Sequence, residues 1–330
     1  MQARSEKLWN ERYRKVSDHF GKCIKNVSGI FVAFNTNMDA IKYVDSRLLR
    51  HLQIDRFSQK NNVSEIRSLD NFKTGLITSM KLGRAMEWEI KDTETYNHLL
   101  GNIAYDSHRI GGQAGIVANV LTHLGMKDVA VFNPKLSEAE ADMYDSRVKM
   151  FKISRGSARV LKAKDAYSIH DAPKINLVFE FGKGLKVKTK DTSFSVPRMN
   201  RFIVSCRPKG REPFFDDCIA DNFKKVFKGI KRVFLSGYQA LSTDEQFFKA
   251  KVQLSLMRKA NREMKMHLEF TSEEDLEKVS RIVKYLLPSF DSLGCNEREM
   301  CILLESMGES DLAGSIKSSG YRAPELFEGI

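Results

Sequence analysis

Two adjacent glycines, Gly111 and Gly112, precede an apolar helical run over residues 116–121 and limit the possible folds more than any other stretch. Glycine has no Cβ, so a ligand can approach the backbone N–H groups closely at this point. The helix N-terminus adds a partial positive charge there, and Gln113 in the first turn offers a donor and an acceptor to a polyol. A tight strand-to-helix turn without a ligand fits the same residues. The stretch therefore predicts a strand–turn–helix unit that is also a candidate ligand site.

The chain of 330 residues is long enough for one large domain, or for a large and a smaller one. Its hydrophobic content of 42% and charged content of 29% are ordinary for a globular enzyme. No apolar run reaches the ~18 residues that a membrane-spanning helix needs, and the polar start of the chain does not resemble a signal peptide. Five scattered cysteines without metal-ligand spacing are typical of reduced thiols. We therefore expect a cytoplasmic protein with no membrane partner.

The net charge of +12 suits nucleic acid, anionic small substrates or simply a solvated basic surface. Lysine and arginine are spread along the chain rather than concentrated in one arm or helix, and no nucleic-acid-binding motif accompanies them. We therefore expect no nucleic-acid partner. A nucleic-acid-binding protein would be retained on DNA or RNA with a steep dependence on salt, which offers a direct way to exclude that class.

A buried strand is predicted over residues 28–34, and polar side chains follow it at Asn35, Asn37 and Asp39. If this segment stays extended, the three side chains project from one face. Open α/β sheets bind ligands just beyond the carboxyl ends of their strands, and an aspartate carboxylate there can accept hydrogen bonds from two sugar hydroxyls. An Asx-turn, in which the same side chains bond only their own backbone, fits this stretch equally well.

Helix and strand patterns alternate over residues 116–133 and again over 213–330, which predicts a parallel sheet. Residues 158–205 interrupt this rhythm and are typical of antiparallel strands. We therefore predict a smaller sheet domain inserted twice into a larger α/β domain. The predicted large domain comprises residues 1–39, 108–164 and 206–330, and the predicted small domain comprises residues 40–107 and 165–205.

Two acidic motifs stand at predicted strand ends. In His267-Leu268-Glu269 the histidine and the glutamate alternate along one strand face, and Asn296 precedes Glu299 by three residues. Hard carboxylate ligands suit Mg²⁺, which keeps most of its waters, so Glu269 and Glu299 could hold Mg²⁺ through water. A helix capping box formed by Asn296 and Glu299 is the alternative, and a core histidine is the simpler interpretation of His267.

These motifs, in this order, resemble the ADP-dependent phosphofructokinase/glucokinase family of the ribokinase superfamily, and the resemblance covers nearly the whole chain. The motifs are Asn35-Thr36-Asn37-Met38-Asp39, Arg109-Ile110-Gly111-Gly112-Gln113-Ala114-Gly115, Ser236-Gly237-Tyr238-Gln239-Ala240-Leu241, His267-x-Glu269 and Asn296-x-x-Glu299. The resemblance implies a ribokinase-like three-layer α/β/α large domain that binds nucleotide and sugar, with a smaller, mainly β lid domain. It also implies a monomeric, glycolytic kinase that transfers the β-phosphate of ADP to fructose 6-phosphate or glucose with Mg²⁺ as cofactor, releasing AMP.

The resemblance also assigns roles to individual residues. Sugar-binding roles fall on Asn37, Asp39, Glu87, Gly112, Gln113, Lys174 and Asn176. Phosphate-binding roles fall on Arg198 and Arg201 in the lid, where a guanidinium can pair with phosphate through two hydrogen bonds. Metal-binding roles fall on Glu269 and Glu299.

Two positions bear on the choice of sugar. Asn176 stands where glucose-specific members of the family have histidine, and Lys174 lies beside it. A lysine together with a lid arginine would neutralise a 6-phosphate, so the resemblance favours fructose 6-phosphate, with glucose as a second substrate. Whether Arg198 or Arg201 faces ADP stays open.

One family feature is missing from these 330 residues. Family members are longer and carry a Gly-x-Gly-Asp motif, whose aspartate is the general base and whose glycines form an anion hole; no such motif occurs here. A general base typically contributes about 10²–10⁴-fold in rate. The expected catalytic residue therefore lies outside this sequence. We expect either a fragment of a longer kinase or a truncated relative that binds sugar or sugar phosphate without turning it over.

Overall fold

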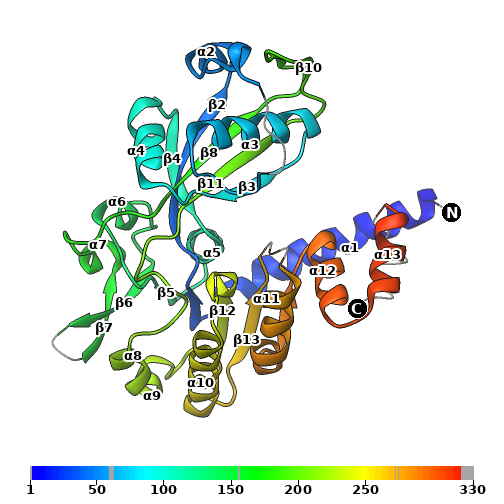
Figure 1. Cartoon of the computed structure of the whole chain (residues 1–330). Helices are drawn as coiled ribbons and strands as arrows, with labels where there is room; N and C mark the ends of the chain where they lie inside the picture. The colour runs from blue at the N-terminus through cyan, green and yellow to red at the C-terminus, as the bar shows by residue number, and fades with distance from the viewer. Residues whose placement is uncertain (1, 59–62, 155–156, 272, 274, 321–330) are drawn as a thin grey trace. The chain divides into compact units, whose positions relative to one another are not determined.

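The computed structural model describes residues 2–58, 63–154, 157–271, 273 and 275–320, and the chain divides into two compact units (Figure 1). The large unit comprises Met1–Thr36, Gly112–Asp171 and Gly210–Ile330, and the small unit comprises Asn37–Gly111 and Ala172–Lys209. The first changeover falls between Thr36 and Asn37, whereas the sequence analysis placed it after Asp39. Asn37 and Asp39 therefore belong to the small unit.

The large unit is built on a seven-stranded sheet in the order β14-β13-β12-β1-β5-β6-β7. Its strands are β1 (Ile30–Ala33), β5 (Val129–Phe132), β6 (Lys149–Ser154), β7 (Ser157–Lys162), β12 (Arg232–Ser236), β13 (Lys265–Glu269) and β14 (Ser292–Gly294). Every neighbouring pair is parallel except β6 and β7, which are antiparallel. The alternation of strand and helix in the sequence correctly indicated this parallel α/β sheet.

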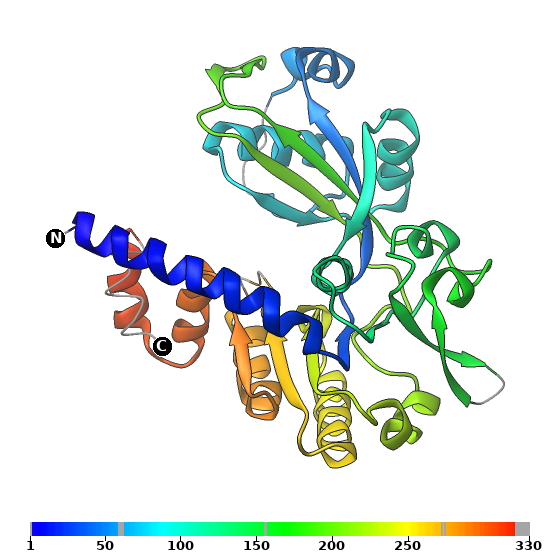
Figure 2. The same ribbon diagram turned by 180° about the vertical axis from the view of Figure 1, so that it is seen from behind.

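Helices cover both faces of the large sheet: α10 and α11 lie on the face seen in Figure 1, and α1 and α5 on the face seen in Figure 2. The helices of this unit are α1 (Gln2–Cys23), α5 (Gln113–His123), α6 (Glu138–Ala141), α7 (Ala163–Ala166), α8 (Asp217–Asp221), α9 (Phe223–Val226), α10 (Asp244–Ala260), α11 (Leu276–Arg281), α12 (Glu297–Ser306) and α13 (Ser310–Ser318). Among the described residues, no helix is both long enough and apolar enough to cross a membrane.

The helix and strand pattern of residues 213–330 predicts one helix near residues 215–228 and another over residues 273–287, and both differ from the structure. The helix expected near residues 215–228 is split into α8 and α9 at Asn222, whose side chain bonds the carbonyl of Cys218 at 2.8 Å. The helix expected over residues 273–287 is α-helical only from Leu276 to Arg281 and continues as a π-helical turn over Ile282–Leu286. In both cases the apolar spacing located the segment but not the local hydrogen-bond pattern.

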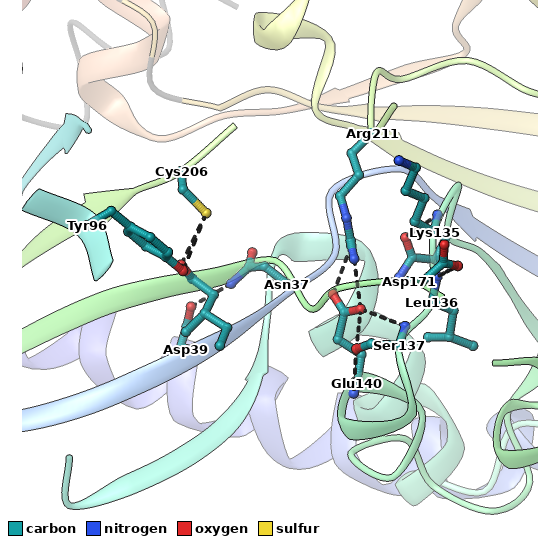
Figure 3. A network of polar contacts seen from close by, with 12 residues as sticks. Asn37, Asp39, Tyr96, Lys135, Leu136, Ser137, Glu140, Asp171, Cys206 and Arg211 are labelled. Atoms are coloured by element: carbon teal, nitrogen blue, oxygen red, sulfur yellow. Dashed lines mark hydrogen bonds and ion pairs between the residues drawn. The ribbon is translucent and has the colours of Figure 1, made fainter. Parts of the chain in front are cut away.

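Two segments that enter or leave the small unit are held on the large unit beside α6 (Figure 3). Ser137 and Glu140 form a capping box at the start of α6. The Glu140 carboxylate also accepts two hydrogen bonds from Arg211, at 2.8 and 2.9 Å, and both side chains are buried. The Asp171 carboxylate accepts a hydrogen bond from the Leu136 N–H at 3.1 Å. Charge-assisted, bidentate pairs are the strongest kind of side-chain hydrogen bond. The Arg211–Glu140 pair therefore fixes the segment that follows the small unit to α6 of the large unit.

The small unit combines a five-stranded sheet, in the order β3-β11-β8-β2-β4, with a two-stranded ribbon and three helices. Its strands are β2 (Asn37–Val44), β3 (Met86–Glu89), β4 (Ser107–Gly111), β8 (Ile175–Phe181), β9 (Lys186–Lys188), β10 (Ser193–Ser195) and β11 (Asn200–Ser205), and its helices are α2 (Ser46–His51), α3 (Leu69–Leu82) and α4 (Thr93–Asn102). Residues 158–205 were expected to be antiparallel, yet β8 is antiparallel to β11 and parallel to β2. Pairing with the distant strand β2 makes this sheet mixed.

One face of the small sheet is apolar and the other is polar. Alternate residues such as Ala40, Phe179 and Phe202 point to the apolar face and form a core with Phe72 and Leu76 of α3. Because side chains alternate along a strand, the residues between them occupy the opposite face. That polar face carries Asn37, Asp39, Glu87, Arg109, Asn176, Glu180 and Arg201, as the strand registers show.

The core of the large unit is centred on β1, whose four residues are all buried. The Phe31 ring lies 5.4 Å from that of Phe151, 5.8 Å from Phe215 and 5.2 Å from Phe227, in tilted or edge-on geometries. Aromatic rings prefer such geometries, which add to the free energy gained by burial. The central strand of the sheet is therefore fixed by rings that come from three other segments.

We expect Phe31→Ala to lower the free energy of unfolding by about 3–5 kcal/mol, because it leaves a cavity where a fully buried ring stood. Urea denaturation followed by circular dichroism measures this loss. Phe248→Ala is the control, since Phe248 is 66% exposed and its loss should change stability by no more than about 0.5 kcal/mol. Equal losses in the two variants would contradict the placement of Phe31.

Candidate functional site

The polar face of the small sheet holds a carboxylate that is largely shielded from water. Asp39 projects from β2, and the Asn37 side chain donates a hydrogen bond from Nδ2 to Asp39 Oδ1 at 2.6 Å (Figure 3). Gly111 of β4 lies directly against this pair, since a Cβ there would come within 2.4 Å of Asp39 Oδ1 and 2.3 Å of Asn37 Nδ2. A side chain at Gly111 would therefore displace the Asn37 and Asp39 side chains.

Three predicted site residues, together with Arg109, act on the Asp39 carboxyl. Burial raises the pKa of the Asp39 carboxyl above its ordinary value of 3.8, while the Asn37 hydrogen bond and the charges of Arg109 and Arg201 lower it. The charge of Glu87 raises it further. Glu87 comes from β3 and Arg201 from β11, so the strand order gathers residues that are far apart in the sequence around one carboxylate.

Arg109 and Glu180 complete this cluster, and the sequence analysis gave neither a role. Arg109 Nη2 lies 3.2 Å from Glu180 Oε1, and Arg109 Nε lies 4.0 Å from Asp39 Oδ2. Arg109 was part of the quoted glycine motif, so its position was a usable signal. The sequence around Glu180 shows only the alternation of a strand over residues 175–181. That pattern does not reveal a partner 71 residues away.

Three further predicted residues are placed less centrally. Asn176 lies opposite Asp39 in the register of β2 and β8, and its Oδ1 accepts a weak hydrogen bond from the Cys206 N–H at 3.4 Å. Lys174 immediately precedes β8, where its carbonyl accepts from the Met38 N–H at 2.7 Å. Arg198 stands in the turn before β11, against Gly83, and only Arg201 of the two lid arginines is among the charges that act on Asp39.

Gly112, the second glycine of the pair, is required by its backbone conformation. Gly112 belongs to the large unit, caps α5 with a φ of +72°, and a Cβ on it would lie 2.3 Å from the Asn35 carbonyl oxygen. Only glycine adopts this backbone conformation readily. The Asn35 carbonyl in turn accepts a hydrogen bond from the Ala114 N–H at 3.0 Å, so the start of α5 is held closely against the end of β1.

The expectation that Asn35 shares a face with Asn37 and Asp39 is wrong. The chain leaves the large sheet after Ala33 and begins a new strand in the other sheet at Asn37, so the alternation does not run through residues 35–39. Asn35 lies in the large unit, where its side-chain amide donates a hydrogen bond to Gln113 Oε1. Asn35 therefore orients a predicted sugar-binding side chain.

The carboxyl ends of β5 and β12 carry buried polar atoms. Asn133 Nδ2, Ser236 Oγ and Gln239 Oε1 have no hydrogen-bond partner in the part of the chain that the structure describes. Buried polar groups are nearly always satisfied, so such atoms mark places where ordered water or a ligand completes the bonding. Ser236 and Gln239 belong to the Ser-Gly-Tyr-Gln motif, to which the sequence analysis gave no individual roles.

The His267-Leu268-Glu269 motif lies at the ends of β13 and β14. Glu269 Oε2 lies 3.2 Å from His267 Nε2, and His267 Nδ1 lies 2.9 Å from Ser292 Oγ. Gly294 is the register partner of Glu269, and a Cβ on it would lie 2.2 Å from Glu269 Oε2. His267 is thus held between two polar groups at the strand ends, and its ring also packs on that of Phe234, with the ring centroids 4.9 Å apart.

Glu299 has the capping role that the sequence offered as an alternative. Its Oε2 accepts a hydrogen bond from the Asn296 N–H at 2.8 Å, and Asn296 Oδ1 accepts from the Glu299 N–H at 3.0 Å. Burial raises the pKa of the neighbouring Cys295 thiol, and the charges of Glu299 and Glu269 raise it further. Both glutamates therefore act on Cys295, which places the two carboxylates in one neighbourhood.

Comparison with known proteins identifies the family to which the chain belongs. Residues 28–326 match the ADP-specific Phosphofructokinase/Glucokinase conserved region. The chain belongs to this family. The ADP-specific phosphofructokinase of Thermococcus zilligii is 31% identical over 87% of this chain, and the ADP-dependent glucose/glucosamine kinase of Pyrococcus furiosus is 29% identical over 92%. The chain spans 66% of the length of the Thermococcus zilligii protein and 67% of the Pyrococcus furiosus protein.

Solved structures agree with this assignment. An ADP-dependent kinase in complex with fructose-6-phosphate and ADPβS superposes with a TM-score of 0.83 and 30% identity, over 97% of this chain and 68% of that one. The last common ancestor of ADP-dependent phosphofructokinases from Methanosarcinales gives a TM-score of 0.76 at 30% identity, over 98% of this chain and 70% of that one. The α/β fold implied by the sequence motifs is thereby confirmed.

Within this family member, the described residues contain no group of three or more His, Cys, Asp or Glu side chains arranged to bind a metal. A pair of carboxylates is a different kind of donor set. Mg²⁺ commonly uses one or two carboxylates and keeps several waters, and Glu269 is 40% exposed at its side chain. The two glutamates near Cys295 therefore fit a Mg²⁺ ion held largely through water, and they do not form a closed protein cage.

We expect Asp39→Asn to raise the urea midpoint of unfolding at neutral pH. A carboxyl whose pKa is raised by folding binds its proton more tightly in the folded chain, so its ionisation costs stability as the pH rises above 3.8. The amide removes that cost. Urea unfolding over a range of pH should show the difference from the wild type disappear below the ordinary aspartate range. A variant less stable than the wild type at neutral pH would contradict this account.

Proposed function

We propose that the protein is an ADP-dependent sugar kinase, which transfers the β-phosphate of ADP to fructose 6-phosphate, with glucose as a further substrate and AMP as the product. The observation that carries the proposal is the shielded Asp39 carboxylate, bonded by Asn37 and flanked by two arginines and Glu87. The names of the relatives support the reaction class, since they are ADP-specific phosphofructokinases and an ADP-dependent glucose/glucosamine kinase.

Recognition of the sugar rests on complementary groups. An ionised Asp39 accepts hydrogen bonds from sugar hydroxyls, and Asn37 and Asn176 supply amide groups on the same face. Arg201 and Lys174 would neutralise the phosphate of fructose 6-phosphate. Glu87 adds a carboxylate to that face, which suits the hydroxyls of a neutral sugar and is the reason to retain glucose as a second substrate.

Gly112 and Gln113, at the start of α5, are also proposed to bind the sugar. Gly112 leaves the backbone accessible, and the helix N-terminus favours groups of negative character. Asn35 occupies the Gln113 carbonyl oxygen, so the Gln113 amide nitrogen is left to donate to the substrate.

Mg²⁺ is the cofactor that this proposal includes. Glu269 and Glu299 would hold it, and Mg²⁺ supplies neutralisation of the ADP phosphates, on which phosphoryl transfer depends. His267 contacts the Glu269 carboxylate, and Gly294 leaves the space that this carboxylate occupies. Small molecules are thus the proposed partners: a sugar or sugar phosphate, and ADP.

Asp39→Ala should abolish detectable sugar binding, because it removes the acceptor at the centre of the polar face. Calorimetric titration with fructose 6-phosphate and with glucose measures binding, and AMP release from Mg-ADP measures turnover. Asp55→Ala is the matched control, since Asp55 is an exposed aspartate of the same unit. Undiminished sugar binding in Asp39→Ala would contradict the proposal. Binding by the wild type without AMP release would instead select the alternative of a sugar-binding relative that does not turn over.

Glu269→Gln should raise the Mg²⁺ concentration needed for half-maximal ADP binding, by about 10–100-fold, as is typical when a metal site loses a supporting group. The amide keeps the shape of the side chain and removes its charge. Titration of Mg²⁺ at fixed ADP measures the change, and Glu263→Gln, at an exposed glutamate of the same unit, provides the control. An unchanged Mg²⁺ requirement would remove Glu269 from the metal site.

A further inference from the structure

The Arg109 side chain extends across strand β2 and contacts Glu180. It stands on β4 opposite Asp39 of β2, whereas Glu180 stands on β8 opposite Tyr43 of β2. The contact of 3.2 Å between Arg109 Nη2 and Glu180 Oε1 therefore bridges β4 and β8 over β2. Midway between these register positions is Ile41, which lies on the polar face and is only 1% exposed.

We propose that Glu180 is a positioning residue of the sugar site, which holds Arg109 across β2 so that its guanidinium stays beside the Asp39 carboxylate. This inference rests on the proposed function, because it gives the Arg109–Glu180 pair a purpose within that site. Glu180 is not itself expected to touch the sugar for this purpose.

The need for such a residue follows from the exposure of Arg109. Its side chain is 51% exposed, against 17% for Asp39 and 28% for Glu180. An arginine has many rotamers, and ordering it costs conformational entropy, so a lone contact of 4.0 Å to Asp39 would not hold it. The second carboxylate fixes the far end of the guanidinium and leaves Nε facing Asp39.

The charges that act on Asp39 come from three other strands of the same sheet. They are Arg109 on β4, Arg201 on β11 and Glu87 on β3. Burial and Glu87 raise the pKa of Asp39, and the two arginines oppose them. Arg201 is also the register partner of Glu180, so Glu180 stands between the two arginines. Its removal takes away the 3.2 Å contact that holds Arg109, and Arg109 is then free to turn into solvent.

An ionised Asp39 is what the sugar needs, because a protonated carboxyl loses acceptor capacity. Keeping Arg109 in place therefore extends the pH range in which the site can accept hydroxyl hydrogens. Glu180→Gln should shift the titration of Asp39 to higher pH, although the substitution lies on another strand and preserves the shape of the side chain.

The experiment follows the Asp39 carboxyl carbon directly by NMR, in full-length chain labelled at the aspartate carboxyls, with the signal assigned by its loss in Asp39→Asn. The variants are Glu180→Gln, Arg109→Gln and the double variant. The matched control is Glu89→Gln, because Glu89 lies on the same face of the sheet but pairs with Lys91 at 2.6 Å. In parallel, calorimetry measures binding of fructose 6-phosphate and of glucose over the same range of pH.

Upward shifts of the Asp39 pKa in Glu180→Gln and Arg109→Gln, no shift in Glu89→Gln, and no further shift in the double variant support the proposal. The pH at which sugar binding is half lost should rise in the same variants. An unchanged or lowered Asp39 pKa in Glu180→Gln overturns it, even if both sugars bind. If the wild type binds neither sugar while the NMR shifts appear as expected, the positioning of Arg109 stands and the proposed function fails.

Discussion

The alternation of side chains along β2 is the constraint on which the candidate site depends. Ala40 and Val44 of this strand enter the apolar core, and Asn37 and Asp39 consequently face the other way. A slip of one residue would exchange these two sets. The hydrogen bond from the Met38 N–H to the Lys174 carbonyl, at 2.7 Å, begins the pairing with β8 in the correct register. Burial of the apolar residues thus determines which face of the sheet carries Asn37 and Asp39, and the hydrogen bond between these two side chains then orients them on that face.

Much of the large unit could be predicted because its signals are local. Residues 129–132 form a buried apolar run bounded by turn residues, and they are strand β5. The spacing of Asn296 and Glu299 predicts a capping box, which the structure contains. A cap depends only on residues within one helical turn, so the sequence carries all the information that it needs.

The remainder depends on contacts that the sequence does not display. Asn35 was grouped with Asn37 because a period of two relates them, but the chain changes sheets between them. Glu180 and Arg109 are 71 residues apart and meet only because β2 lies between their strands. The order of the strands depends on how the whole unit packs. A contact between residues on different strands therefore cannot be predicted from the sequence around either residue.

The discontinuity of the large unit has a consequence for the order in which the chain can fold. The central pairing of the large sheet joins Ile30 to Arg232, whereas the small unit is complete at Lys209. During synthesis, domains fold as their residues emerge. The small sheet can therefore assemble while β1 still lacks β12 as a neighbour. The small unit interrupts the large unit in the sequence, yet all of its residues are synthesised before those of the large unit are complete.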